Sequence, residues 1–184
     1  MRRDIVCALA TVLLCWSPLR AADNLVAGTT VGIRPEKVLR AVFRTTGSFP
    51  FPSSPTDATL QVFDTALPSA GNVTYSFRDE LWQGLGSPPG SAGWRWSRPT
   101  LAYTDLCRLI LIKPTVIKVL CSRPLNSIPP VPAIYPPFSG DVGLILTVGD
   151  QRYCAQFGGV TAVNNASGLR RRNAPAPASC PVPP

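Results

Sequence analysis

The sequence predicts an all-β fold, an antiparallel β-sandwich or small barrel with two disulfides. Short alternating or apolar segments recur between proline and glycine residues, and helical periodicity is almost absent. One segment, residues 106–121, is a continuous apolar hairpin with a cysteine near each end. About nine short strands joined by polar turns are typical of a sandwich or a small barrel.

The first 21 residues have the three parts of a secretory signal peptide. Arg2 and Arg3 supply the charge, residues 5–16 are apolar, and Ala21 ends a small-residue cleavage site. The apolar run is short for a membrane anchor, which needs about 20 residues, and Cys15 lies in a poor lipoprotein signal. We therefore expect cleavage after Ala21 and export to the periplasm or outside the cell, with no transmembrane span in the mature chain. The β-rich domain would cover residues 22–172, and a Pro/Ala tail residues 173–184.

Four cysteines remain after this cleavage: Cys107, Cys121, Cys154 and Cys180. An even number in an exported chain indicates two disulfides. A hairpin turn centred on Pro114 places Cys107 opposite Cys121, which leaves Cys154 to pair with Cys180.

The same hairpin register predicts the buried face of residues 106–121. Leu109 would face Val119, and Leu111 would face Ile117. Since side chains alternate across a strand, these four residues would share one apolar face with the two cysteines.

The remaining elements follow from apolar alternation and from the proline and glycine residues between the segments. Strands are expected at residues 28–33, 38–45, 59–63, 72–77, 93–98, 141–148 and 152–157. Residues 78–85 read as the one helical turn, and residues 49–55, 86–93 and 122–137 read as loops. The bond from Cys180 would pull the tail back across the sheet, where its prolines would lie in extended form along an edge.

Net charge is the first guide to partners. The 184-residue chain has a net charge of +8, and removal of residues 1–21 takes away three arginines and one aspartate, leaving +6. A basic balance can indicate an anionic partner such as nucleic acid or a lipid A surface. The arginines are dispersed, and the run Arg170–Arg172 reads as a solvated loop. Export argues against a nucleic-acid partner.

Four segments together resemble a recurrent bacterial secreted domain of unknown function. They are LWQGLGSPPGSAGWRW, DLCRLILIKPTVIKVLC, PPFSGDVGLILTVGDQRYCAQFGG and RRRNAPAPASCP. The resemblance runs from about Asp57 to Pro181 and includes a Tyr-Cys-x-x-Phe-Gly-Gly segment and a Cys-Pro tail. It implies export, paired cysteines and a β-rich domain, and it assigns no catalytic residue.

The absence of histidine is the strongest statement about chemistry. It removes Ser-His-Asp and Cys-His catalysis and the usual zinc, copper and iron sites. An acid-pair hydrolase or a calcium site could draw on Asp57, Asp64, Asp79, Glu80, Asp105, Asp141 and Asp150. No spacing among them favours either site, so we expect no enzyme activity, no metal and no cofactor.

Aromatic residues suggest an alternative function. Trp94 and Trp96 are two residues apart and share a strand face, with Trp82 before them and Tyr103 after them. Exposed, they could stack on sugar rings as an envelope-glycan-binding site; buried, they would pack on the core while Arg95 faces solvent. The leading prediction is an exported, non-catalytic, disulfide-stapled β-domain with a structural or partner-binding role. A glycan-binding module and a hydrolase of unfamiliar design remain the alternatives.

Overall fold

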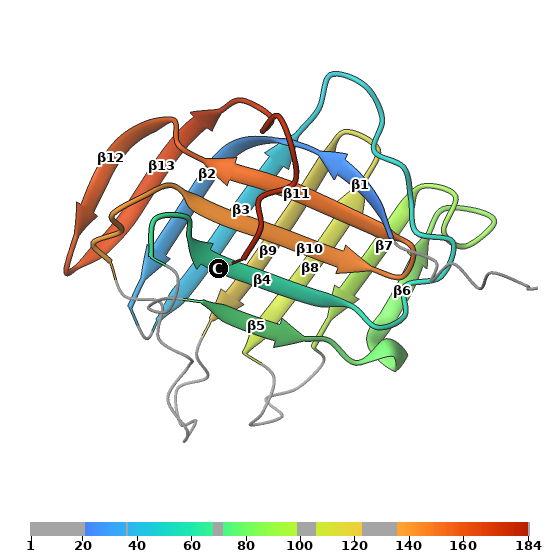
Figure 1. Ribbon diagram of the computed structural model, residues 1–184. Coiled ribbons are helices and arrows are strands. Elements are labelled where there is room, and N and C mark those ends of the chain that lie inside the picture. The colour runs from blue at the N-terminus through green and yellow to red at the C-terminus, as the bar shows by residue number, and fades with distance from the viewer. Residues whose placement is uncertain (1–20, 36, 68–71, 99–105, 123–135, 184) are drawn as a thin grey trace, which may run out of the picture.

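The computed structural model describes residues 21–35, 37–67, 72–98, 106–122 and 136–183. These residues form two β-sheets packed face to face, with the strands of one sheet crossing those of the other (Figure 1). The five-stranded sheet contains β1 (Ala22–Leu25), β4 (Thr59–Asp64), β5 (Val73–Ser76), β10 (Val142–Val148) and β11 (Gln151–Phe157). The eight-stranded sheet contains β2 (Ala27–Arg34), β3 (Val38–Arg44), β6 (Trp82–Leu85), β7 (Gly93–Ser97), β8 (Cys107–Lys113), β9 (Val116–Ser122), β12 (Val160–Asn165) and β13 (Gly168–Ala174). The predicted sandwich with two disulfides is therefore confirmed.

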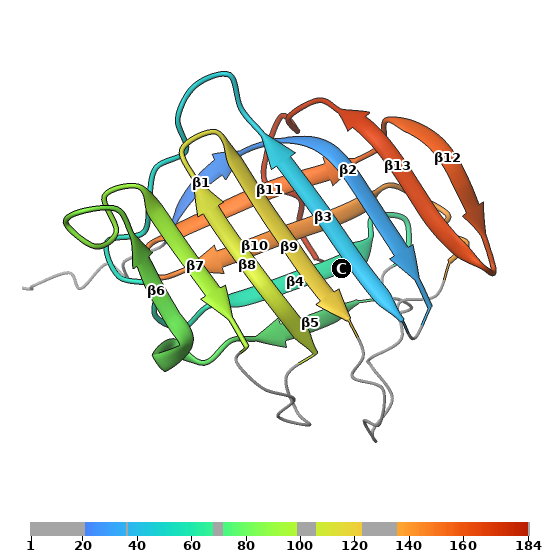
Figure 2. The same cartoon turned by 180° about the vertical axis from the view of Figure 1, so that it is seen from behind.

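The strand order shows how the two sheets are connected. It is β1-β11-β10-β4-β5 in one sheet and β12-β13-β2-β3-β9-β8-β7-β6 in the other, seen from behind in Figure 2. All pairs are antiparallel except β1 with β11, which run parallel. The chain passes from the first sheet to the second at Val26, whose amide donates to the carbonyl of Cys154.

The core lies between the sheets because most of the strands turn apolar positions inward. Leu60 and Leu146 from the five-stranded sheet and Phe43 and Ile117 from the eight-stranded sheet are fully buried there. In the part of the chain that the structure describes, no helix is long and apolar enough to span a membrane.

The β8–β9 hairpin confirms one disulfide and corrects the predicted register. Cys107 pairs with Cys121 as expected and is bonded to it. Arg108 is then an extra residue, so that Leu109 lies opposite Leu120 instead of Val119. Such a β-bulge moves every later position of its strand to the other face.

Because of the bulge, the predicted buried face is wrong for Leu109 and Leu111, whereas Ile117, Val119 and Cys121 of β9 are buried as predicted. Ile110 and Ile112 point into the core, whereas Leu109 and Leu111 are half-buried on the outer face. Lys113 pairs with Val116, so the turn is Pro114–Thr115 and is not centred on Pro114.

Other elements differ from the predictions in identifiable places. The predicted helical turn at residues 78–85 is a short 3-10 helix, η1 (Asp79–Leu81), followed by β6. The run Arg170–Arg172, predicted to be a solvated loop, lies in β13. Strands β1, β12 and β13 were not predicted, and most of the predicted loop at residues 122–137 lies outside the described residues.

The C-terminal tail returns across the sheet as predicted, but it lies over the face of the sheet instead of along an edge. Cys180 is bonded to Cys154 on β11, as expected. Cys154 is turned to the outer side of the five-stranded sheet beside Phe63 and Ile145, and Cys180 packs on this cluster. The tail therefore crosses the face of the sheet and does not lie along an edge (Figure 1).

Candidate functional site: the basic face of the eight-stranded sheet

The outer side of the eight-stranded sheet collects most of the described cations. Its strands alternate apolar residues, which face the core, with residues that face solvent. Nine of the outward or strand-end positions are exposed Lys or Arg residues. They are Arg34, Arg40, Arg44, Arg95, Arg108, Lys113, Lys118, Arg170 and Arg172; we call this surface the basic face.

Strand order brings together cations that are far apart in the sequence. Arg170 of β13 lies opposite Gly32 of β2, which in turn lies opposite Arg40 of β3. Since neighbouring strands are about 4.8 Å apart, the Cα atoms of Arg170 and Arg40 are roughly 10 Å apart. No side chain lies between them, because the intervening residue is Gly32. Lys118 of β9 and Arg95 of β7 flank Leu111 of β8 in the same way.

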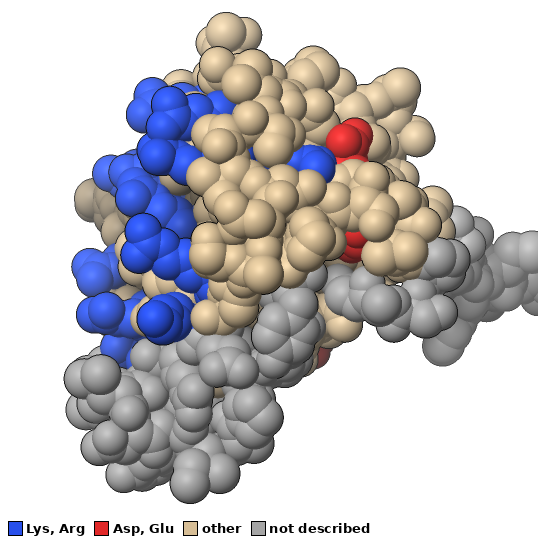
Figure 3. All heavy atoms as spheres, turned by 90° about the vertical axis from the view of Figure 1, so that its left-hand side faces the viewer, with Lys and Arg blue, Asp and Glu red and all other residues tan. Residues whose placement is uncertain are grey.

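The acidic residues lie elsewhere. The seven that the structure describes lie on the five-stranded sheet, in the loops that flank it or in η1: Asp23, Asp57, Asp64, Asp79, Glu80, Asp141 and Asp150. Within the described ranges, none of the nine cations of the basic face has an ion pair. Figure 3 shows Lys and Arg gathered on the side of the molecule that belongs to the eight-stranded sheet. Such a concentration of one charge attracts anions and raises their local concentration.

Arg171 is the exception in the arginine run. It points inward, is 7% exposed, and donates to the carbonyl of Phe157 at 2.9 Å. Its guanidinium also lies 3.4 Å from the Asp141 carboxylate. This arginine ties β13 to the other sheet, whereas Arg170 and Arg172 face solvent.

Sequence reasoning missed the basic face, although a signal for it exists. The positions that alternate with buried apolar residues in β3, β9 and β13 are repeatedly basic, as in Arg40, Lys118 and Arg170. The alternation was used to predict the apolar side only. Which strands are neighbours cannot be read from the alternation, so the gathering of the charges was not visible.

The three tryptophans of the predicted glycan site point toward the core. Trp96 is 1% exposed, donates to the carbonyl of Arg78 at 3.0 Å and packs edge-on against Phe77. Trp94 is half-buried and donates to the carbonyl of Pro52 at 3.1 Å. Trp82 pairs with Trp96 across the strands and is also half-buried.

This arrangement argues against a sugar-stacking platform. A ring that stacks on a sugar must present its flat face to solvent, and Trp96 presents none. Arg95, between the two tryptophans, is the exposed residue of this strand. Tyr103, which was predicted to lie near them, is outside the described residues.

The carboxylates hold backbone segments in place. Asp64 is 2% exposed and accepts bonds from the amides of Ala66, Ser139 and Gly140 at 2.9, 2.7 and 2.9 Å. Asp150 accepts from Ser53, and the backbone bond from that residue lowers the Asp150 pKa. Asp105 lies outside the described residues.

Two further carboxylates also accept hydrogen bonds within the protein. Asp79 accepts a bond from the amide of Asp57 at 3.0 Å, and Asp141 accepts one from Gln156 at 2.8 Å. These bonds account for the positions of the two carboxylates.

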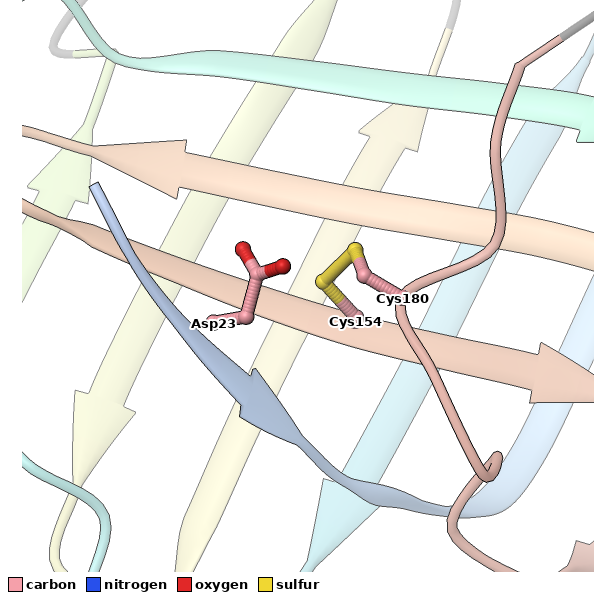
Figure 4. Close-up of side chains that lie close together, drawn as sticks. All are labelled: Asp23, Cys154 and Cys180. Atoms are coloured by element: carbon pink, nitrogen blue, oxygen red, sulfur yellow. A yellow bond between two sulfur atoms is a disulfide. The ribbon is translucent and has the colours of Figure 1, made fainter. Parts of the chain in front are cut away.

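The second disulfide has a charged neighbourhood. Asp23 of β1 lies beside Cys154 and Cys180 (Figure 4). Arg152 joins the group, with one guanidinium nitrogen 3.2 Å from the Asp23 carboxylate and the other 3.2 Å from the Cys180 sulfur. Because the two sulfurs are bonded to each other, neither is a thiolate that could bind a metal.

Comparison with known proteins gives no relative. No family model matches the chain, and neither the curated proteins nor the solved structures contain a match. The resemblance to a recurrent secreted domain therefore stays a prediction, and function must be argued from the chain itself.

Proposed function

We propose that this protein is an exported, non-catalytic binding module that docks on an anionic lipid surface of the cell envelope. The observation that carries the proposal is the basic face, where nine cations gather without an acidic neighbour among the described residues. Each Lys or Arg close to an anionic membrane contributes about 1 kcal/mol of binding free energy. Eight or nine such contributions together amount to about 8–9 kcal/mol, which corresponds to a Kd of about 1 μM or slightly below.

Export is supported by the signal-peptide pattern of residues 1–21 and by the two disulfides, which persist in oxidising compartments. A non-catalytic role is supported by the lack of histidine and by the bonded state of the four cysteines. A lipid surface is favoured over nucleic acid because the basic face also contains outward-facing leucines, such as Leu109 and Leu111. Nucleic-acid backbones offer no apolar partner for such residues.

Vesicle binding tests the proposal. Wild-type protein is expected to sediment with vesicles that contain phosphatidylglycerol and not to bind vesicles of phosphatidylcholine alone. Binding should weaken as the salt concentration increases. Arg40→Gln with Arg170→Gln should weaken binding about thirtyfold, since two cations at about 1 kcal/mol each are lost.

A matched control removes two charges elsewhere. Arg152 lies on the other sheet, and Lys37 lies in the β2–β3 turn and is not one of the nine residues of the basic face. The Lys37→Gln/Arg152→Gln variant should keep most of the binding. Equal losses in both double variants would contradict the proposal, as would salt-dependent binding to duplex DNA without binding to the anionic vesicles.

A further inference from the structure

A groove lies within the basic face at the end where the β6–β7 loop meets the β8–β9 turn. Its volume is about 610 Å³, in the range of small-molecule sites. It is lined by Leu85, Ala92, Arg95, Leu109, Leu111, Lys113 and Pro114. Five of these residues are apolar and the other two are cations.

The bulge at Arg108 creates the apolar floor of this groove. Without it, the alternation of β8 would turn Leu109 and Leu111 into the core together with Cys107. With it, both leucines are half-buried on the outer face and take no part in the core. Leu109 lies opposite Leu120, another half-buried outward leucine, so this charged surface carries an apolar cluster. Apolar patches on a surface often mark a binding site.

Positively charged residues flank the apolar floor of the groove on two sides. Leu111 lies between Arg95 of β7 and Lys118 of β9 in the strand register. Arg95 and Lys113 are both exposed and line the groove itself. An apolar channel with cations at its margin complements one kind of molecule, a hydrocarbon chain that ends in an anion.

We infer that the groove binds the acyl chain of a single anionic lipid, whose phosphate is held by Arg95 and Lys113. The inference rests on the proposed function and narrows it. The basic face brings the protein to the membrane, and the groove takes one lipid chain out of the bilayer. Leu109 and Leu111 would contact the chain, and the two cations would pair with the headgroup.

Alkyl phosphates test the inference, because they carry the same two features in water-soluble form. Calorimetry on the wild type would compare octyl, decyl and dodecyl phosphate below their micelle concentrations. Each added pair of methylenes should tighten binding about tenfold if the chain is buried. Inorganic phosphate, which has no chain, should bind far more weakly than dodecyl phosphate. Dodecanol should also bind more weakly than dodecyl phosphate, because it has no phosphate to pair with Arg95 and Lys113.

Two variants locate the site. Leu111→Thr keeps a strand-forming residue but removes most of the apolar side chain, and it should weaken dodecyl phosphate binding about tenfold or more. Leu120→Thr is the matched control, because Leu120 is also a half-buried outward leucine but does not line the groove. Arg95→Gln should reduce the preference for dodecyl phosphate over dodecanol. Melting temperatures without ligand show that each variant is folded.

The outcomes separate the inference from the proposed function. Binding that does not depend on chain length, or an equal loss in Leu111→Thr and Leu120→Thr, would overturn the groove while vesicle docking stands. Unchanged vesicle binding in Arg40→Gln/Arg170→Gln, with chain-length dependence intact, would support the groove and contradict the docking role of the distant cations.

Discussion

Gly28 of β2 lies directly beneath the ring of Phe157 of β11. A Cβ atom at Gly28 would overlap the edge of that ring. Phe157 also packs against Phe43 of β3, with ring centroids 5.7 Å apart. The two sheets come together at this corner, and the missing side chain of Gly28 lets the aromatic ring enter.

Gly28→Ala should therefore destabilise the protein by about 1–3 kcal/mol, because overpacking forces the Phe157 ring or the β2 backbone to move. Gly32→Ala, on the same strand, is the control, since its Cβ would meet nothing closer than the Leu169 carbonyl at 4.0 Å. Urea unfolding of both variants measures the difference. Equal stability of the two variants would show that the packing around Phe157 accommodates a Cβ atom at position 28.

The disulfides should differ little in their contribution to stability. Cys107 and Cys121 are 14 residues apart, and Cys154 and Cys180 are 26 residues apart. Chain-entropy arguments give about 3 and 3.5 kcal/mol for loops of these lengths. Paired Cys→Ala variants measured by urea unfolding give the two values, and peptide mapping without reduction checks the pairing. A peptide that links Cys121 to Cys154 would contradict the fold itself.

The local sequence pattern predicts the hairpins. It does not predict which side chains gather on one face of a sheet, because that depends on the order of the strands. The Cys107–Cys121 pair and the hairpin across Gly149 and Asp150 follow from the distance along the chain between complementary segments. The bulge at Arg108 could not be predicted, because neither glycine nor proline marks it. One extra residue then exchanged the inner and outer faces of β8.

Long-range pairing explains what else was missed. Arg170 looked like part of a solvated loop because its partner strand β2 lies more than a hundred residues earlier in the chain. The basic face exists only because β13, β2 and β3 are neighbours, an order that no short segment determines.

Two buried tyrosines should make the fold sensitive to alkali. Burial raises the pKa of Tyr75 to about 12, and burial together with the nearby Asp150 charge raises the pKa of Tyr153. In the unfolded chain both ionise near the ordinary value of 10.0. Their contribution is present below that pH and is lost as pH rises above it, by about 1.4 kcal/mol per pH unit for each tyrosine.

The Tyr→Phe variants separate these two contributions. Tyr75→Phe should make the alkaline loss of stability less steep. Tyr153→Phe should do the same, and it should also lower stability at neutral pH because the hydroxyl donates to the Pro50 carbonyl at 2.6 Å. Unfolding curves from neutral to alkaline pH provide the test, and an unchanged slope in both variants would mean that neither tyrosine is held neutral.

Cleavage after Ala21 would keep every strand that the structure describes. Ala22 is the first residue of β1, and its backbone nitrogen donates to the Asp150 carbonyl at 2.8 Å. We expect N-terminal sequencing of the exported protein to begin at Ala22. A start several residues later would remove β1, and a start at Met1 would contradict the signal-peptide prediction.

The C-terminal tail should act as a cover as well as a tether. Cys180 packs on Phe63, Ile145 and Cys154, an apolar cluster on the outer side of the five-stranded sheet. Truncation after Ala174, the last residue of β13, would expose this cluster and leave Cys154 without its partner. We expect a lower melting temperature and disulfide-linked dimers under oxidising conditions.

Two further variants separate the cover from the bond. Cys154→Ala in the truncated chain should abolish the dimers, yet the melting temperature should stay low because Phe63 and Ile145 remain exposed. Cys154→Ala with Cys180→Ala in the full chain loses the tether but keeps the tail residues that can still lie on the cluster, so it should melt above the truncated form. If these two variants melt at the same temperature, the tail acts only through its disulfide, and the covering role is wrong.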